Sequence, residues 1–149
     1  MASHKFRSRI HAAQQAVKVW ICEACGIWHN KGKPKVCQHC GDGAHILYFA
    51  SSGEARRYTS LRMLQDFGRI SGLRVQVPFP VYVNGEAISR HKLGKPVFTY
   101  FADFVYDRED GTQVVEDYKG AVEGMMQVFK LKRKIIEPLY GITITITEG

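Results

Sequence analysis

The cysteines of this chain constrain its fold more than any other residue type. The 149 residues contain four of them, arranged as two CxxC pairs with eleven residues between the pairs: Cys22, Cys25, Cys37 and Cys40. Four thiolates satisfy the tetrahedral preference of Zn²⁺, and each CxxC loop lets two sulfurs converge on one ion. Each pair is followed by a glycine, Gly26 or Gly41, which can adopt the positive φ of a tight metal-binding turn. We therefore predict one structural zinc site made of four sulfurs.

Other uses of these cysteines explain the pattern less well. A reducing cytosol argues against two disulfides. A thioredoxin-type redox pair does not account for two equivalent pairs with a short spacer, because that spacing indicates one shared ion. His29 and His39 are further possible ligands, but four cysteines already complete the coordination shell.

The stretch from Trp20 to Gly43 resembles a zinc ribbon. Zinc ribbons hold nucleic acid or protein with basic, glycine-punctuated loops, and the resemblance implies such a role for the loop 29–35. Its basic residues are Lys31, Lys33 and Lys35, and Trp20 and Trp28 are nearby as stacking surfaces. The alternative is that the loop is merely solvated and that Trp28 packs on the metal site.

The charge of the chain suits a polyanionic partner. The net charge is +7, and residues 1–50 carry +5 of it, from seven Lys and Arg against two acids. Cations that neutralise phosphates release condensed counterions and so gain affinity. We therefore expect the N-terminal arm, residues 1–19, to contact DNA through Lys5, Arg7 and Arg9.

The chain also lacks the sequence signals of membrane insertion and export. No apolar run approaches the roughly 20 residues needed to span a bilayer, and the first residues are polar and basic. We expect a cytoplasmic protein without membrane contact.

Residues 44–149 are predicted to form an α/β domain, because apolar runs and turn signals alternate along them. The predicted order is strand, helix, three strands, helix, strand, at 45–50, 51–67, 73–83, 97–106, 112–119, 122–137 and 142–146. Ser51 or Ser52 should cap the start of the first helix and Gly68 should end it, and Pro138 should end the second helix. The result is a mixed sheet flanked by helices.

Two acids lie in strands where a solvated charge is not expected. Asp103 is in the middle of an otherwise apolar strand, where an isolated carboxylate costs several kcal/mol or takes up a proton. Strand alternation places Asp117 and Lys119 on one face of the next strand and Glu116 on the other. Asp103 and Asp117 should therefore converge at one end of a hairpin.

Converging carboxylates are the ligands that Mg²⁺ prefers. We predict a magnesium site at Asp103 and Asp117, with the backbone carbonyl of Tyr118 as a further ligand and Lys119 placed to orient or deprotonate water. Glu54 is the fourth candidate, because it shares a helix face with apolar residues. Its simpler interpretation is an acid in the first helical turn. The simpler interpretation of the whole set is a hairpin with an ordinary salt bridge.

These residues resemble the PD-(D/E)xK nuclease superfamily. The resemblance spans His45 to Ile146 and is carried by Ser52-Gly53-Glu54-Ala55, Ala102-Asp103-Phe104, Val115-Glu116-Asp117-Tyr118-Lys119-Gly120 and Phe129-Lys130-Leu131-Lys132-Arg133-Lys134. More closely, these motifs are similar to small phage and prophage endonucleases that are compared with Holliday-junction resolvases. The chain departs from the name of the motif, because Ala102 and not proline precedes Asp103.

The resemblance implies a restriction-endonuclease-like core and a fold in which Glu54, Asp103, Asp117 and Lys119 are catalytic, with Mg²⁺ or Mn²⁺ as cofactor. It also implies cleavage to 5′-phosphate and 3′-hydroxyl ends, in phage DNA replication or recombination. Symmetric cleavage of a junction would require a homodimer.

The second predicted helix carries a polar stripe. Gln127, Lys130 and Lys134 stand opposite an apolar set, and we expect them to contact DNA phosphates. An ordinary solvated helix face explains the same pattern.

From the residues and the resemblance together, we predict a magnesium-dependent endonuclease that acts on branched DNA. Two other functions remain open. One is a non-catalytic DNA-binding or recruitment module on a nuclease scaffold. The other is a nuclease that acts on linear ends or nicks.

Overall fold

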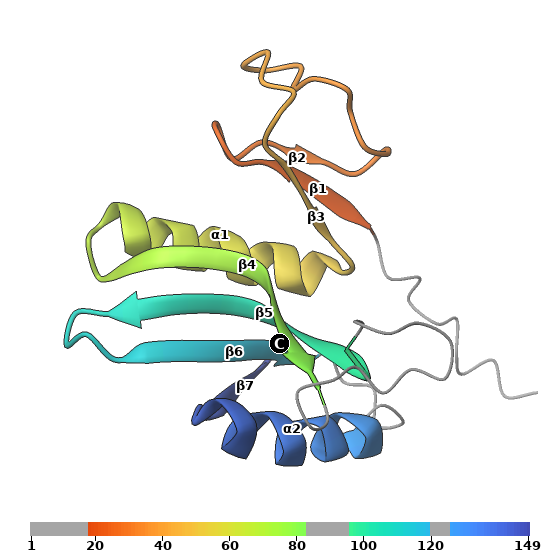
Figure 1. Ribbon diagram of the computed structural model, residues 1–149. Helices are drawn as coiled ribbons and strands as arrows, with labels where there is room; N and C mark the ends of the chain where they lie inside the picture. The colour runs from red at the N-terminus through yellow and green to blue at the C-terminus, as the bar shows by residue number, and fades with distance from the viewer. Residues whose placement is uncertain (1–17, 83–95, 120–125) are drawn as a thin grey trace, which may run out of the picture. The chain divides into compact units, whose positions relative to one another are not determined.

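The computed structural model describes residues 18–82, 96–119 and 126–149. The chain divides into two compact units, Met1–Ala55 and Arg56–Gly149 (Figure 1). The predicted DNA-binding residues Lys5, Arg7 and Arg9 lie outside the described residues. In the part of the chain that is described, no helix has the length and apolar character needed to cross a membrane.

The first unit contains a three-stranded antiparallel sheet. Its order is β2-β1-β3, with β1 at Val19–Cys22, β2 at Trp28–His29 and β3 at Ile46–Phe49. The sequence pattern predicts that the strand at 45–50 opens the larger domain, but β3 pairs with β1 instead. Val19 of β1 pairs with Phe49 of β3, and both side chains are buried. This register therefore places apolar residues of the two strands on the same buried face.

Helix α1, Ser52–Asp66, has well-defined ends. The Ser51 hydroxyl accepts a hydrogen bond from the backbone amide of Glu54 at 3.1 Å, as an N-cap residue does. At the other end Gly68 has φ +71°, and the Arg69 amide donates to the Leu64 carbonyl at 2.8 Å. The predicted cap and the predicted stop at Gly68 are both confirmed.

The second unit contains a mixed four-stranded sheet of order β4-β5-β6-β7. Its strands are β4 at Ile70–Val81, β5 at Phe98–Arg108, β6 at Gln113–Lys119 and β7 at Ile144–Glu148. The first two pairings are antiparallel and the β6–β7 pairing is parallel. The mixed α/β class predicted from the sequence is therefore confirmed.

Helix α2, Met126–Tyr140, runs through Pro138, so the predicted stop at that proline is wrong. Pro138 lies in the last turn, where the loss of one backbone hydrogen bond costs less than in a helix interior. The helix ends at Tyr140. The next residue, Gly141, has φ +62°, and the Ile142 amide donates to the Glu137 carbonyl at 3.1 Å. The predicted start at 122 lies outside the described residues.

The core of the second unit lies between the sheet and α2, which runs along one face of the strands in Figure 1. It consists of Val81, Tyr100, Ala102, Val105, Val115, Phe129, Ile136 and Ile144. Helix α1 contacts the other face, because Arg57 binds Glu116, the residue that follows Val115 in β6. The two helices therefore flank the sheet from opposite faces.

Candidate functional site

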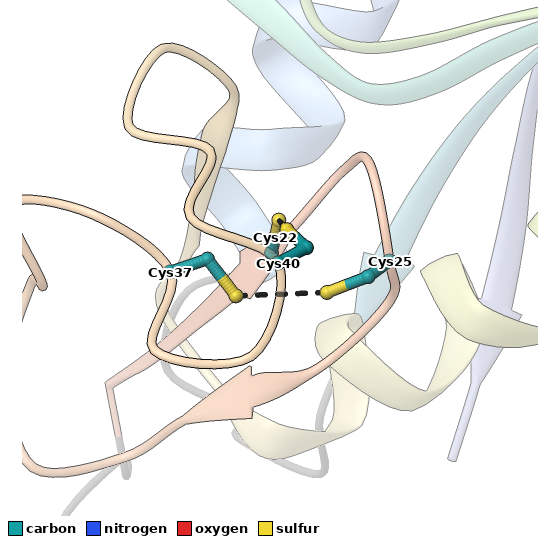
Figure 2. Close-up of side chains that lie close together, drawn as sticks. All are labelled: Cys22, Cys25, Cys37 and Cys40. Carbon is teal, nitrogen blue, oxygen red and sulfur yellow. Dashed lines mark hydrogen bonds between the residues drawn. The ribbon is translucent and has the colours of Figure 1, made fainter.

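The four cysteines come together in the first unit as a cluster suited to a metal ion such as zinc. Their sulfurs all lie within 4.8 Å of one another, and the Cys22–Cys40 and Cys25–Cys37 Sγ atoms are 3.5 Å apart. Figure 2 shows Cys25 and Cys37 pointing toward each other. Zn–S bonds of about 2.3 Å in a tetrahedron require sulfur separations of about 3.8 Å, so the donor set fits the ion.

Two similar backbone turns hold the cluster. The amide of Gly26 donates to the carbonyl of Cys22 at 2.7 Å, and the amide of Gly41 donates to that of Cys37 at 2.8 Å. Both glycines have the positive φ expected from the sequence, +77° and +79°. A side chain at Gly41 would meet no atom within 4 Å, so backbone conformation and not space favours glycine there.

The same turns direct backbone amides at the sulfurs. The pKa of the Cys37 thiol is lowered to about 5, chiefly by a hydrogen bond from the backbone amide of Cys40 that opposes the effect of burial; the backbone of His39 and the side chain of His29 add to the lowering. Hydrogen bonds to the thiolate favour the charged form, which is the form that binds metals.

Replacement of Cys37 by serine should leave the purified protein with clearly less than one zinc ion per chain. Binding energy at a structural zinc site, about 10–16 kcal/mol in zinc-finger peptides, is folding energy, so the first unit should loosen more than the second. Elemental analysis and amide hydrogen exchange measure the two effects. His39→Ala, an exposed neighbour, should keep full zinc. Zinc-free parent protein, or disulfides in reduced parent protein, would refute the prediction.

The lysines predicted to contact DNA are accessible on the surface of the first unit. Lys31, Lys33 and Lys35 are exposed. Trp28 is 39% exposed, while the Trp20 ring packs against Tyr48 with 5.5 Å between the ring centroids. Trp28 is thus the more accessible of the two candidate stacking surfaces.

In the second unit, the Asp117 side chain is only 3% exposed. Two side chains contact it, Tyr100 from β5 and Lys119 from β6. The Tyr100 hydroxyl donates to Oδ2 at 2.9 Å, and Lys119 Nζ lies 2.7 Å from Oδ1. Lys119 also lies over the Phe129 ring, 4.3 Å from its centroid. Asp117 and Lys119 therefore share one face, as strand alternation predicted.

Tyr100 remains a neutral hydrogen-bond donor in this arrangement. Burial and then the charge of Asp117 raise the pKa of its phenol far above the ordinary value. Tyr100 was not among the residues singled out from the sequence. The sequence signal that could have identified Tyr100 is a tyrosine in an apolar strand next to a strand with a buried acid, because a buried hydroxyl needs a hydrogen-bond partner.

Asp103 is close to the same segment. Its Oδ2 accepts from the backbone amide of Tyr118 at 2.8 Å, and its Oδ1 accepts from Gln76 Nε2 at 3.0 Å. The structure therefore brings Asp103 beside the 117–119 segment, as predicted. Gln76, a further residue that the sequence did not reveal, has φ +50°, a backbone conformation that is uncommon without glycine.

Strand alternation breaks near Asp103. Ala102 and Val105 belong to the same core cluster, although residues three apart should lie on opposite faces. Tyr100 and Tyr106 are six residues apart, so regular alternation would place them on the same face. Instead Tyr100 binds Asp117 and Tyr106 binds Glu116, and these two acids lie on opposite faces of β6. Gln76 stands opposite this break, between the Val75 and Val77 pairings. The irregularity turns the Asp103 carboxylate toward β6.

Glu116 lies on the face of β6 opposite Asp117, as predicted. It is 1% exposed and accepts from Arg57 Nε at 2.6 Å, from Arg57 Nη2 at 2.8 Å and from the Tyr106 hydroxyl at 3.0 Å. Burial by itself raises the pKa of Glu116, but the Arg57 hydrogen bonds and charge hold it below the ordinary value. This acid is thus fully engaged in a structural network.

Glu54 has a structural role at the start of α1. Its Oε2 accepts from the backbone amide of Ala50 at 3.2 Å, and its own amide donates to Ser51. Both bonds satisfy backbone amides at the helix start, much as a capping box does. Glu54 belongs to the first unit, whereas Asp103 and Asp117 belong to the second.

Helix α2 has the predicted two-sided character. Gln127, Lys130 and Lys134 are exposed, while Phe129 and Ile136 are buried in the core cluster. The polar stripe is thus available for contact with a polyanion.

Comparison with known proteins finds one family model that matches residues 43–145, described as "Protein of unknown function (DUF1064)". No curated protein and no solved structure matches the chain. The matched range contains Glu54, Asp103, Asp117 and Lys119 but begins after the last of the four cysteines. The cysteine cluster is therefore an addition to the part that the family model describes.

Proposed function

The chain belongs to the DUF1064 family of proteins of unknown function, and we propose that it is a metal-dependent DNA endonuclease whose site is formed by Asp103, Asp117 and Lys119. The observation that carries the proposal is the buried Asp117–Lys119 pair, with the Asp103 carboxylate hydrogen-bonded to the backbone amide of Tyr118 between them. The resemblance of the motifs to PD-(D/E)xK nucleases supports it.

Each buried acid of β6 has one cationic partner, and the nearby Asp103 carboxylate is what distinguishes the Asp117 site from a structural ion pair. Glu116 and Asp117 are the buried charged side chains among the described residues. Glu116 binds a guanidinium through both oxygens, which completes its charge balance. Asp117 has the ammonium of Lys119 on one oxygen and a neutral phenol on the other. Because the Asp103 carboxylate converges on the same segment, the local negative charge favours a cation.

The donor set suits Mg²⁺ or Mn²⁺, which prefer carboxylate and carbonyl oxygens. Asp103 and Asp117 would hold the ion, with the Tyr118 carbonyl as a further candidate. When bound, the ion supplies Lewis-acid stabilisation of the phosphate and a more acidic water. Lys119, fixed by Asp117 and Phe129, would orient the attacking water or stabilise negative charge on the phosphate.

Exposed cations provide the DNA contacts in this proposal. Lys130 and Lys134 on α2, with Gln127, would position the backbone of the DNA, and Lys31, Lys33 and Lys35 would add affinity from the first unit. The resemblance to resolvases favours branched DNA, a homodimer and a phage or prophage origin, with a role in DNA replication or recombination. Glu54 is a weaker candidate for catalysis, since capping accounts for its position.

The rival function is a non-catalytic DNA-binding or recruitment module. The exposed Lys31, Lys33 and Lys35, which precede the residues that the family model matches, favour it. Buried acids argue against it, because a binding surface for phosphates would gain affinity without them.

The test is incubation of purified protein with linear duplex, nicked, flap and four-way-junction DNA, with Mg²⁺, with Mn²⁺ and with chelator. We expect cleavage of the branched substrates that depends on the metal. Preferential cutting of linear or nicked DNA would assign a different nuclease activity. Binding without cleavage of any substrate would establish the rival function.

Removal of the basic side chains assigned to phosphates should weaken DNA binding without altering sequence preference. Deletion of one phosphate-binding cation should flatten the slope of log affinity against log salt by about 0.9 for duplex DNA. We expect this for alanine at Lys31, Lys33 and Lys35, and for alanine at Lys5, Arg7 and Arg9. Arg69→Ala is the control, because Arg69 already pairs with Glu109 at 3.1 Å. An unchanged slope in these variants would contradict the role of the cations.

A further inference from the structure

We propose that Tyr100 is a positioning residue that holds the carboxylate of Asp117 in the orientation needed for a divalent cation. This inference rests on the proposed function and deepens it, because it assigns a role to a residue outside the acid and lysine set. Its basis is the hydrogen bond from the Tyr100 hydroxyl to Asp117 Oδ2, 2.9 Å long and buried.

The two oxygens of Asp117 are held from different directions. Lys119 Nζ pairs with Oδ1, and the Tyr100 hydroxyl donates a hydrogen bond to Oδ2. A carboxylate has about four lone-pair sites, so two such bonds leave about two for a cation. Without the hydroxyl, the carboxylate is free to rotate toward Lys119 and to use both oxygens on the ammonium. Tyr100 therefore keeps Oδ2 available to a metal ion.

The packing of Tyr100 separates this role from a purely structural one. Its ring belongs to the core cluster and lies 6.1 Å from the Phe79 ring, measured between centroids. Phenylalanine would keep these contacts and remove only the hydroxyl. A role in packing alone therefore predicts little change in Tyr100→Phe, whereas a positioning role predicts weaker metal binding.

The same strand supplies a matched control. Tyr106 also donates its hydroxyl to an acid of β6, to Glu116 at 3.0 Å, but on the opposite face. Both tyrosines are buried, at 4% and 7% exposure. Tyr100→Phe and Tyr106→Phe therefore delete the same bond, a phenol to a buried carboxylate, on the two sides of one strand. Only the first deletion touches the proposed metal ligand.

The experiment titrates Mn²⁺ into zinc-loaded parent protein and into Tyr100→Phe, Tyr106→Phe and Asp117→Asn, with calorimetry as the readout. Asp117→Asn defines binding that does not use the site. Loss of a hydrogen-bond partner of a metal ligand typically costs 10–100-fold in affinity, and we expect a loss of about this size in Tyr100→Phe. Tyr106→Phe should bind Mn²⁺ within about twofold of the parent. Circular dichroism checks that each variant is folded.

Cleavage of the preferred DNA substrate over a range of Mn²⁺ concentrations supplies the second readout. Tyr100→Phe should need more Mn²⁺ than the parent and should recover much of the parental rate at saturation. Parental Mn²⁺ affinity in Tyr100→Phe would overturn the positioning role and leave the nuclease proposal intact. A parent that binds Mn²⁺ through Asp117 but cuts no DNA would overturn the nuclease proposal alone. Equal binding by the parent and Asp117→Asn would overturn both.

Discussion

Asp117→Asn should lower the rate of DNA cleavage by about three orders of magnitude or more, equivalent to roughly 4 kcal/mol of transition-state stabilisation. The amide keeps the shape of the side chain but removes the charge of a metal ligand and the ion pair with Lys119 at 2.7 Å. DNA binding should hold or tighten, because repulsion of the phosphates falls. Single-turnover cleavage and fluorescence anisotropy measure the two quantities.

Neighbouring substitutions sharpen this prediction. Asp103→Asn should behave as Asp117→Asn does. Lys119→Ala should abolish most cleavage yet leave metal binding largely intact, since a cation is not a ligand. Glu116→Gln is the internal control, because Glu116 lies on the opposite face, with Arg57 and Tyr106. It should cut at nearly the parental rate per folded molecule, although its stability will fall.

Two results would contradict the assignment. An inactive Glu116→Gln protein beside an active Asp117→Asn protein would place the site on the α1 face of the sheet. Loss of DNA binding together with cleavage in Asp117→Asn would point to a structural role for the pair.

Arg57→Ala should destabilise the second unit by about 3–5 kcal/mol at neutral pH. The reason is that Glu116 is 1% exposed and would lose the guanidinium that binds both its oxygens. An isolated buried carboxylate has no comparable compensation, even with the Tyr106 hydroxyl still in place. Urea denaturation, monitored in the second unit by amide hydrogen exchange, gives the loss.

The destabilisation should shrink as the pH falls. In the parent the pKa of Glu116 lies below its ordinary value of 4.5, so the stability that this group contributes is present above pH 4.5 and is lost as the pH falls through the folded pKa. Without Arg57, burial raises the pKa of Glu116 above that of the unfolded chain. The group then destabilises the variant as the pH rises, so the two proteins should converge on acidification.

Arg56→Ala is the matched control for this series. Arg56 is the exposed neighbour of Arg57 on α1, and its loss should change stability by less than about 0.5 kcal/mol. The double variant Arg57→Met with Glu116→Leu should recover much of the loss, because it leaves no unpaired buried charge. A constant difference between parent and Arg57→Ala from pH 7 to pH 4 would contradict the role of Glu116 ionisation.

The chemistry of single residues and their spacing determined the parts of this protein that depend on local geometry. Two CxxC pairs followed by glycines predicted the cysteine cluster, because each short loop presents two sulfurs and one tetrahedral ion requires the two loops to meet. Period-two alternation likewise separated Asp117 from Glu116 along β6, since neighbouring residues of a strand point to opposite faces. Capping by Ser51 and the stop at Gly68 are local for the same reason.

Tertiary structure decided what alternation and composition leave open. The sheet in which β3 lies depends on its pairing with β1, which is a contact between segments far apart in sequence. The end of α2 depended on Gly141 and not on Pro138, because a proline in the last turn loses little. The partners of the acids also come from distant elements: Arg57 from α1, and Tyr100 and Tyr106 from two sides of a break in β5. A break in alternation leaves no mark in the sequence, so only the folded sheet assigns each tyrosine to its carboxylate.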